Sequence, residues 1–329
     1  MSEHHSLQFP ENLPIIDSTP VNCGVCGAND CEYFASSYDF EYETCGNRWT
    51  FVRCRRCENV YLNPRPLVKD LNVIYPSNYY SYGYESTVNK LAWKVKAVLD
   101  RLTFKKIIDI LGYPPRSYLD IGCGSGRYLR LINGLGVGKE KVFGLELDGP
   151  AAKRLKDEGF MVEKERIEDA ELPENFFDLV TLFSVIEHVE SPKACLEKIY
   201  KILAPGGVVC FEAPNIKSLN ASLFRDYHWG GYHTPRHWNL FSLDTITKVA
   251  RPMGYEFAGL KRSTGHAFWL WSFHHYVKYQ LGFKKLGELL NPSKCLPLVA
   301  VATLVDTIRA KLGQETDNSI IFLRKPRTA

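Results

Sequence analysis

The chain has 329 residues, 45% of them hydrophobic and 24% charged, which is the composition of a soluble globular protein with room for a large and a small domain. A net charge of +4 is too small to predict binding to nucleic acid or to an anionic membrane. Residues 1–20 lack the basic start and apolar core of a signal peptide, and no apolar run approaches the ~20 residues that span a bilayer. We therefore expect a cytoplasmic protein without a membrane span.

Cysteines dominate the segment that follows a loose, polar tail at residues 1–20. In residues 21–66 two C-x-x-C pairs, "CGVC" and "CRRC", are separated by 27 residues, which in the cytoplasm indicates metal binding rather than disulfides. Four thiolates complete the tetrahedron of a structural zinc ion and leave no position for water. We predict a zinc-ribbon module at 21–66, with Cys31 or Cys45 as alternative ligands. The predicted zinc ligands are Cys23, Cys26, Cys54 and Cys57.

A tyrosine-rich segment and a helix follow at residues 67–113. "YPSNYYSYGYES" begins at Tyr75, and residues 88–112 repeat apolar positions at intervals of three and four up to a glycine, which predicts a helix and its cap. Tyr79 and Tyr80 are candidates to line an acceptor pocket. Packing of the zinc module against the core is the alternative for both.

From residue 114 short β-rich runs alternate with helical ones, which predicts an α/β fold with a parallel sheet covered on both faces. The predicted strands are 117–121, 141–147, 161–167, 177–183, 207–212, 255–262 and 319–325. The predicted helices between them are 126–136, 149–159, 192–203 and 242–253. Residues 264–317 are aromatic and apolar, so we expect a helical insertion before the last strand of a domain spanning 114–329.

The stretch "SYLDIGCGSGRYLRLI" places three glycines directly after the first strand of this sheet. Such a turn lets backbone N–H groups approach a ligand closely. Its spacing is not that of the dinucleotide fingerprint, and Asp120 on the strand would repel a pyrophosphate and attract a cationic ligand. Glu146, at the end of the next strand, could accept both hydroxyls of a ribose or cap the helix that begins at 149.

Five motifs then follow one another over residues 115–215: "YLDIGCGSGRYL", "VFGLELD", "ERIEDAELPENFFDLV", "LFSVIEHVESP" and "LAPGG". Their order resembles that of class I S-adenosylmethionine-dependent methyltransferases. The resemblance implies a Rossmann-like sheet of seven strands with the last one antiparallel, and a turn that holds the methionine end of the cofactor. The implied cofactor contacts are Asp120, Gly122, Gly124, Glu146, Glu168, Asp169, Phe183 and Ser184.

Two further stretches, "RCRRCENVYLNPRP" and "FRDYHWGGYHTPRHWNLFS", are similar to those of bacterial members from polysaccharide and secondary-metabolite clusters, which begin with a zinc ribbon. The second stretch lies where open α/β sheets bind ligands. Removing a proton from a hydroxyl acceptor needs a base, for which His237 is our first candidate and His233 the second. The predicted substrate contacts are Tyr79, Tyr80, His188, His228, Trp229 and Arg236.

The motif "IEHV" raises the question of a catalytic metal. In ubiquinone-type O-methyltransferases a similar stretch carries an extra acid three residues earlier and binds a metal. Here Ser184 stands at that position, which argues against a catalytic metal. Holding the loop is the favoured role for Glu187 and His188, and a functional role is the alternative.

The leading hypothesis is a methyltransferase acting on a small-molecule acceptor (a sugar, a lipid-linked compound or a natural product), with S-adenosylmethionine as cofactor, structural Zn²⁺ and methylation at oxygen. An RNA methyltransferase that uses the ribbon is one alternative, although acidic residues offset Arg48 and Arg53. A non-catalytic cofactor-binding scaffold is another. For residues 264–317 a buried lid, a homodimer interface and a membrane contact all remain open.

Overall fold

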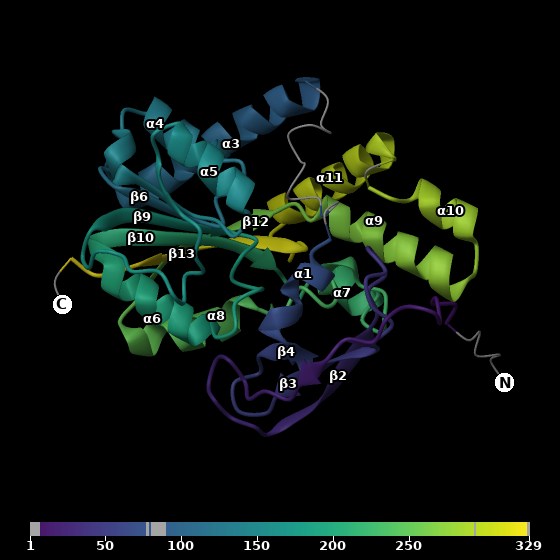
Figure 1. Ribbon diagram of the computed structural model, residues 1–329. Helices are drawn as coiled ribbons and strands as arrows, with labels where there is room; N and C mark the ends of the chain where they lie inside the picture. Colours follow the sequence, from purple (N-terminus) through teal and green to yellow (C-terminus); the bar gives the residue numbers. More distant parts are fainter. Residues whose placement is uncertain (1–6, 77–78, 80–89, 293, 328–329) are drawn as a thin grey trace.

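The computed structural model describes residues 7–76, 79, 90–292 and 294–327. A seven-stranded sheet runs through its centre in the order β12-β13-β10-β9-β6-β7-β8 (Figure 1). Six strands are parallel, and β13 is antiparallel to both of its neighbours, β10 and β12. The strands are β6 (Tyr118–Ile121), β7 (Val142–Leu145), β8 (Met161–Glu163), β9 (Phe177–Phe183), β10 (Leu203–Pro214), β12 (Glu256–Ser263) and β13 (Asn318–Arg324). This confirms the predicted Rossmann-like fold and its antiparallel last strand.

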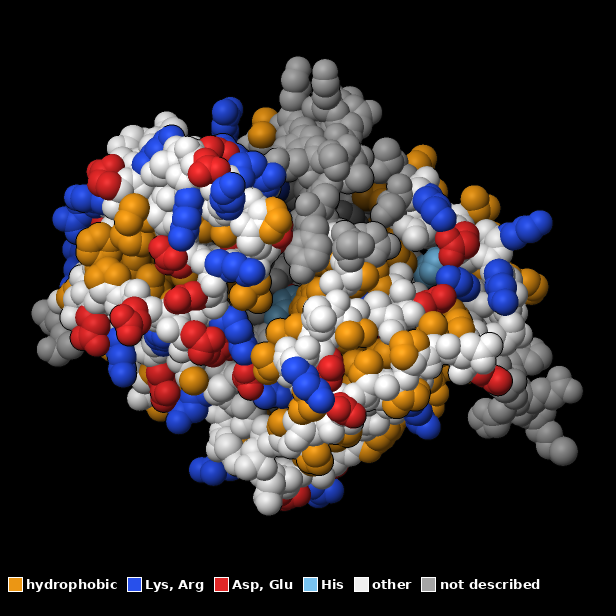
Figure 2. Space-filling view, viewed as in Figure 1, with side chains coloured by type: hydrophobic (Ala, Val, Ile, Leu, Met, Phe, Trp, Pro, Cys, Tyr) orange, Lys and Arg blue, Asp and Glu red, His pale blue; other side chains and the backbone are white. Residues whose placement is uncertain are grey.

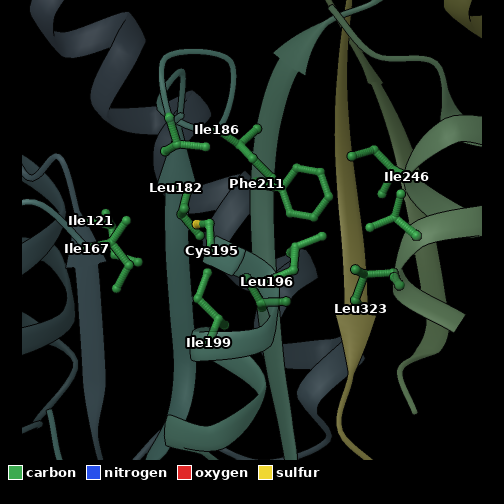
Figure 3. Packing of buried hydrophobic residues seen from close by; sticks show 14 of the residues in the cluster. Ile121, Ile167, Leu182, Ile186, Cys195, Leu196, Ile199, Phe211, Ile246 and Leu323 are labelled. Carbon is green, nitrogen blue, oxygen red and sulfur yellow. The ribbon is translucent and has the colours of Figure 1, made fainter. Parts of the chain in front are cut away.

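Helices cover both faces of the sheet, as expected for strands that are apolar on both sides. In Figure 1, α3, α4 and α5 lie above the sheet and α6 and α8 below it. Alternate residues of β9 supply the two cores: Leu179 packs with α3–α5, whereas Val180 and Leu182 pack with α6 and α8. Figure 3 shows Leu182 and Phe211 of the sheet against the α6 side chains. These helices are α3 (Lys90–Leu111), α4 (Arg127–Gly134), α5 (Gly149–Asp157), α6 (Pro192–Ile202) and α8 (Leu243–Ala250).

Serine caps position the helices on the lower face. The Ser191 side chain accepts a hydrogen bond from Ala194 N, and Pro192 occupies the first turn of α6. Ser242 caps α8 in the same way through Thr245 N. Both helices therefore begin at the residue where the sequence provides a hydroxyl, and this fixes the loops that precede them at the carboxyl edge of the sheet.

The cysteine-rich module forms a second, antiparallel sheet of four strands in the order β11-β4-β3-β2. Its outer strand β11 (Asn239–Leu240) comes from the segment after β10 and pairs with β4 (Val60–Leu62). The other two strands are β2 (Cys31–Ser37) and β3 (Trp49–Cys54), and a short pair joins β1 (Ser18–Thr19) to β5 (Arg65–Pro66). After β5, η1 (Val68–Asp70) leads into α1 (Leu71–Ile74). The module also shares a hydrophobic cluster with the central sheet.

Between β12 and β13 lie α9 (His266–His275), a π-helical turn (Tyr276–Gln280), α10 (Lys284–Leu289) and α11 (Leu296–Lys311). Tyr279 of the turn contacts the cysteine-rich module, with its ring centroid 4.6 Å from that of Phe40. Figure 2 shows hydrophobic side chains over α7 (Leu219–Leu223) and α9. Among the described residues no helix is both long and apolar enough to cross a bilayer. The predicted domain boundaries and the homodimer interface stay predictions.

Candidate functional site

The glycine turn after β6 uses its three glycines in two ways. All three have positive φ, between 53° and 81°. A Cβ on Gly122 would lie 2.5 Å from Val185 Cγ2, and one on Gly126 would lie 2.2 Å from Leu155 Cδ2. A Cβ on Gly124 would meet nothing within 4 Å. Gly122 and Gly126 therefore allow close packing, whereas Gly124 faces open space that a ligand can fill.

Glu146, directly after β7, connects this turn to the next one. Its Oε2 accepts a hydrogen bond from Gly124 N at 2.6 Å, and its Oε1 accepts one from Asp148 N at 2.8 Å. Burial raises the pKa of the Glu146 carboxyl. The carboxylate thus lies beside the space at Gly124, and Asp148, the N-cap residue of α5, makes no side-chain cap bond of its own.

Asp120 on β6 carries a carboxylate oxygen without a partner. The side chain is 2% exposed; Oδ1 accepts a hydrogen bond from Thr181 Oγ1 at 2.6 Å, and Oδ2 has no partner among the described residues. Burial raises the pKa of Asp120 to about 7. A cation would satisfy the free oxygen. The residues present therefore fit S-adenosylmethionine, whose amino acid end carries an ammonium group and whose ribose carries two hydroxyls.

The other implied cofactor residues occupy varied surroundings. Glu168 Oε1 accepts a hydrogen bond from Arg166 Nη2 at 3.1 Å, and Asp169 is exposed. The Phe183 ring lies 4.9 Å from that of Tyr128. Ser184 is exposed at the end of β9 and has φ +56°, a strained conformation that is common at functional sites. Their contacts with the cofactor stay predictions.

The four cysteines of the ribbon converge. Sγ atoms of Cys23 and Cys57 are 3.5 Å apart, as are those of Cys26 and Cys54, and all four lie within 4.8 Å of one another. A tetrahedral zinc with bonds of about 2.3 Å separates its sulfurs by about 3.8 Å, whereas a disulfide needs about 2.05 Å. The hydrogen bond from Cys57 lowers the pKa of Cys23 to about 5. The donor set fits zinc.

The segment after β10 brings both candidate bases into the interior. His237 is 4% exposed; its Nδ1 lies 2.8 Å from Gly231 O and its Nε2 lies 3.9 Å from Glu187 Oε1. His233 Nδ1 lies 2.8 Å from Glu41 Oε2 of the ribbon module, and its Nε2 lies 3.3 Å from the Tyr79 hydroxyl. Burial lowers the pKa of His237 well below its ordinary value. Figure 2 shows a hollow near the middle of this face with a histidine side chain visible in it.

Three predicted substrate contacts have structural roles in this conformation. The guanidinium of Arg236 is fully buried against the Asp39 carboxylate at 2.9–3.0 Å. Trp229 is 0% exposed and packs within a hydrophobic cluster. His228 is buried beside Gln280, with its ring centroid 5.6 Å from that of Phe40. A single sequence does not distinguish these packed side chains from a pocket lining.

The remaining predicted substrate contacts lie around the same histidines. Tyr79 is 6% exposed beside His233, whereas Tyr80 lies outside the described residues. His188, half-buried, has Nδ1 2.9 Å from both Arg236 O and the Tyr75 hydroxyl. Burial lowers its pKa to about 3.

One cluster was missed from the sequence. Donor atoms of Glu187, His188 and His237 all lie within 4.8 Å of one another, although they come from the loops after β9 and after β10. No spacing rule links residues so far apart in the chain, and only the adjacency of β9 and β10 in the sheet could have suggested it.

Comparison with known proteins agrees with this geometry. Residues 95–258 match the family model described as a methyltransferase domain. The ubiquinone biosynthesis O-methyltransferase of Burkholderia vietnamiensis is 34% identical over 113 residues, which cover 32% of this chain and 47% of the relative. A Mycolicibacterium smegmatis protein named "Probable S-adenosylmethionine-dependent methyltransferase" is 28% identical over 137 residues, which cover 41% of this chain and 51% of the relative. The chain thus spans about half the length of the curated relatives it matches.

Solved structures of methyltransferases also align with the chain. That of an S-adenosylmethionine-dependent methyltransferase from Archaeoglobus fulgidus has a TM-score of 0.45 at 17% identity and covers 70% of this chain and 94% of its own. The structure of another, from Mesorhizobium loti, has a TM-score of 0.41 at 14% identity and covers 63% of this chain and 90% of its own. Residues 95–258, just under half of the chain, therefore match a methyltransferase domain, and the strand order and the glycine turn agree with that match.

Proposed function

We propose that this protein transfers the methyl group of S-adenosylmethionine to a hydroxyl oxygen of a small-molecule acceptor such as a sugar, a lipid-linked compound or a natural product. The observation that carries the proposal is the space at Gly124, which adjoins the Glu146 carboxylate. Asp120, on the strand that leads into this turn, adds a buried carboxylate oxygen without a partner among the described residues. The relatives named as ubiquinone biosynthesis O-methyltransferases support oxygen as the acceptor atom.

In this proposal the cofactor lies across the carboxyl ends of β6 and β7. Asp120 would bind its ammonium group, and Glu146 would exchange its bond with Gly124 N for the ribose hydroxyls. When bound, the cofactor supplies a methyl group whose bond to sulfur breaks as the bond to the acceptor oxygen forms. The chain's own residues then position the acceptor and accept its proton, which accounts for most of the catalysis in an in-line transfer.

The contacts favour His233 over His237 as the base. A carboxylate only accepts hydrogen bonds, so Glu41 holds the proton of His233 on Nδ1 and leaves the lone pair on Nε2. That nitrogen lies 3.3 Å from the Tyr79 hydroxyl. The acceptor proton would pass to the Tyr79 oxygen while the Tyr79 proton passes to His233 Nε2, and Glu41 would stabilise the resulting imidazolium.

Calorimetric titration with S-adenosylmethionine tests the cofactor site first. We expect micromolar binding by the wild-type protein and no measurable binding by Glu146→Ala. Glu163→Ala, which removes an exposed carboxylate at the end of the neighbouring strand β8, is the matched control and should bind like wild type. A folded wild-type protein that does not bind the cofactor would contradict the proposal.

Acceptor screening follows with phenols and sugars before RNA, monitored by formation of S-adenosylhomocysteine. For an accepted substrate, Tyr79→Phe should lower kcat by about 100-fold or more, the contribution of a positioned acid–base group, while the cofactor Kd stays unchanged. Equal kcat values for wild type and Tyr79→Phe would remove Tyr79 from the proton path.

A further inference from the structure

Helix α11 directs its polar side chains toward the protein. Asp306 is 1% exposed and accepts hydrogen bonds from Gly265 N at 2.7 Å and from Trp269 Nε1 at 3.1 Å, both at the start of α9. Thr303 and Thr307 are half-buried and donate to backbone carbonyls one turn earlier in α11, each at 2.7 Å. A surface helix of a globular protein ordinarily turns such residues toward water.

The side of α11 that faces outward is apolar instead. Its large hydrophobic side chains recur at intervals of three and four residues, which places them in one stripe along the helix. This stripe, the α11 face, consists of aliphatic residues that are between 39% and 69% exposed: Leu298, Val301, Leu304, Val305, Ile308 and, directly after the helix, Leu312. A continuous apolar surface of this kind marks a contact with another protein or with a membrane.

Basic side chains stand at both ends of the α11 face. Lys294 precedes the helix by two residues, Lys311 is its last residue, and both are exposed. Residues 281–313, which include α10, hold five basic and two acidic side chains, so they carry three of the four net positive charges of the chain. Of the two acids, Asp306 is buried and Glu288 is paired with two lysines. The segment therefore suits an anionic partner.

The residue types of the α11 face favour a lipid surface over a protein partner. The centres of protein interfaces are enriched in tyrosine, tryptophan and arginine and depleted of lysine. The α11 face contains leucine, valine and isoleucine, with no aromatic side chain and with lysine at its ends. Aliphatic side chains with lysines beside them are typical of helices that lie in the headgroup region of anionic bilayers.

We propose that the α11 face docks on the surface of an anionic lipid bilayer. The helix would lie along the bilayer, with its aliphatic side chains at the boundary between headgroups and acyl chains. The ammonium groups of Lys294 and Lys311 would then reach the phosphates. Helix α10 and the residue before it add further exposed side chains of the same two kinds: Phe283, Lys284, Lys285, Leu286 and Leu289.

The α11 face belongs to the insertion that borders the segment after β10. A Cβ on Gly230 would lie 2.6 Å from both Phe268 O and Trp271 Cβ of α9, and Gly230 N donates to Ser272 Oγ at 2.8 Å. Gly230 is three residues before His233, the proposed base. Figure 1 shows α9, α10 and α11 together at the right of the view. A bound bilayer would therefore adjoin the helices that support this segment. The docking itself does not depend on the proposed function.

Vesicle sedimentation of the full-length protein tests the docking. The sucrose-loaded vesicles contain either phosphatidylcholine alone or equal parts of phosphatidylcholine and phosphatidylglycerol. We expect the protein to sediment with the anionic vesicles and to be released as salt screens its lysines. Leu304→Asp should lower the partition coefficient at least about tenfold, since burial of one leucine side chain is worth that factor or more. Lys311→Gln should lower it about fivefold on the anionic vesicles.

Leu135→Asp is the matched control, because Leu135 is also an exposed leucine but directly follows α4, which lies apart from α11 (Figure 1). Its partition coefficient should equal that of wild type. No sedimentation with anionic vesicles, or equal sedimentation of Leu304→Asp and wild type, would overturn the inference. A dimer in analytical ultracentrifugation that Leu304→Asp dissociates, without vesicle binding, would assign the α11 face to a second copy instead. Should Leu304→Asp not fold, Ile308→Asp, one turn further along the same stripe, decides.

Cofactor calorimetry without vesicles distinguishes the docking from the proposed function. Cofactor binding by a protein that does not sediment with vesicles refutes the docking and leaves the proposed function standing. Vesicle binding without cofactor binding supports the docking and refutes the proposed function.

Discussion

The ion pair between Arg236 and Asp39 is the contact whose loss we expect to destabilise the fold most. Both side chains are 0% exposed, and two guanidinium nitrogens lie 3.0 and 2.9 Å from the two carboxylate oxygens. Burial raises the pKa of Asp39, but the charge and hydrogen bonds of Arg236 outweigh it and leave that pKa below its ordinary value. Arg236→Met therefore leaves a buried charge without its partner.

Loss of one member of a buried ion pair costs about 3–5 kcal/mol, a large part of the roughly 5–15 kcal/mol that stabilises a domain. We expect Arg236→Met to lower the free energy of unfolding by about 3–5 kcal/mol in urea denaturation followed by circular dichroism. In a double-mutant cycle with Asp39→Asn, the coupling should be about 1–3 kcal/mol. Lys248→Met breaks the exposed pair with Glu58 and should leave stability unchanged.

The same pair predicts a pH dependence. The folded-state pKa of Asp39 is depressed, so its stabilising effect is complete above the unfolded pKa of about 3.9 and is lost as the pH falls through the lower folded value. This acid-side loss should be absent from Arg236→Met. A coupling energy below about 0.5 kcal/mol would refute the argument that the two charges stabilise each other.

Three further predictions test the ribbon, the cofactor site and the glycine turn. Cys54→Ser should remove one zinc per chain in elemental analysis and lower the melting temperature, and an unchanged zinc content would rule Cys54 out as a ligand. Burial raises the pKa of Asp120 to about 7, so below that pH a cationic cofactor must displace a proton from this carboxyl group. The affinity for the cofactor should therefore rise by up to tenfold per pH unit towards pH 7 and then level off. Calorimetry of Asp120→Asn should show a cofactor affinity that does not change with pH in this way. Gly126 has φ +81° and faces Leu155, so Gly126→Ala should lower the free energy of unfolding by about 1–3 kcal/mol in urea denaturation. Gly134→Ala is the control: a Cβ there would meet nothing within 4 Å, and the free energy of unfolding should not fall.

The central sheet could be predicted because its signals are local. A strand buried on both faces is a continuous apolar run, and a glycine turn is visible in seven residues. The differences are local as well: β8 ends at Glu163 rather than at 167, because its pairing with β7 stops at Glu163, opposite Leu145. Strand β10 begins at Leu203 rather than at 207. It pairs with β9 at Leu203 and, after an irregularity in the register, again from Val208 onward.

The candidate site was predictable only in its cofactor half. The glycine turn and Glu146 follow strand ends, so their meeting at one sheet edge follows from parallel topology. Arg236, by contrast, lies among histidines and aromatic residues that suggest a pocket, and only the fold shows that Asp39 of the ribbon takes its charge. The two-residue strand β11 has no periodicity to detect, yet it joins the two sheets.

Under the proposed function, this joining would give the cysteine-rich module a role at the acceptor side. Asp39 and Glu41 follow β2 of the ribbon, and they bind Arg236 and His233 of the segment after β10. Asp39 also accepts hydrogen bonds from Thr44, so its carboxylate is held from its own side of the interface. A zinc ion on the four cysteines would therefore also hold the histidine proposed as base, whereas the glycine turn is held by the sheet. Loss of the zinc should consequently reduce kcat before it reduces affinity for the cofactor.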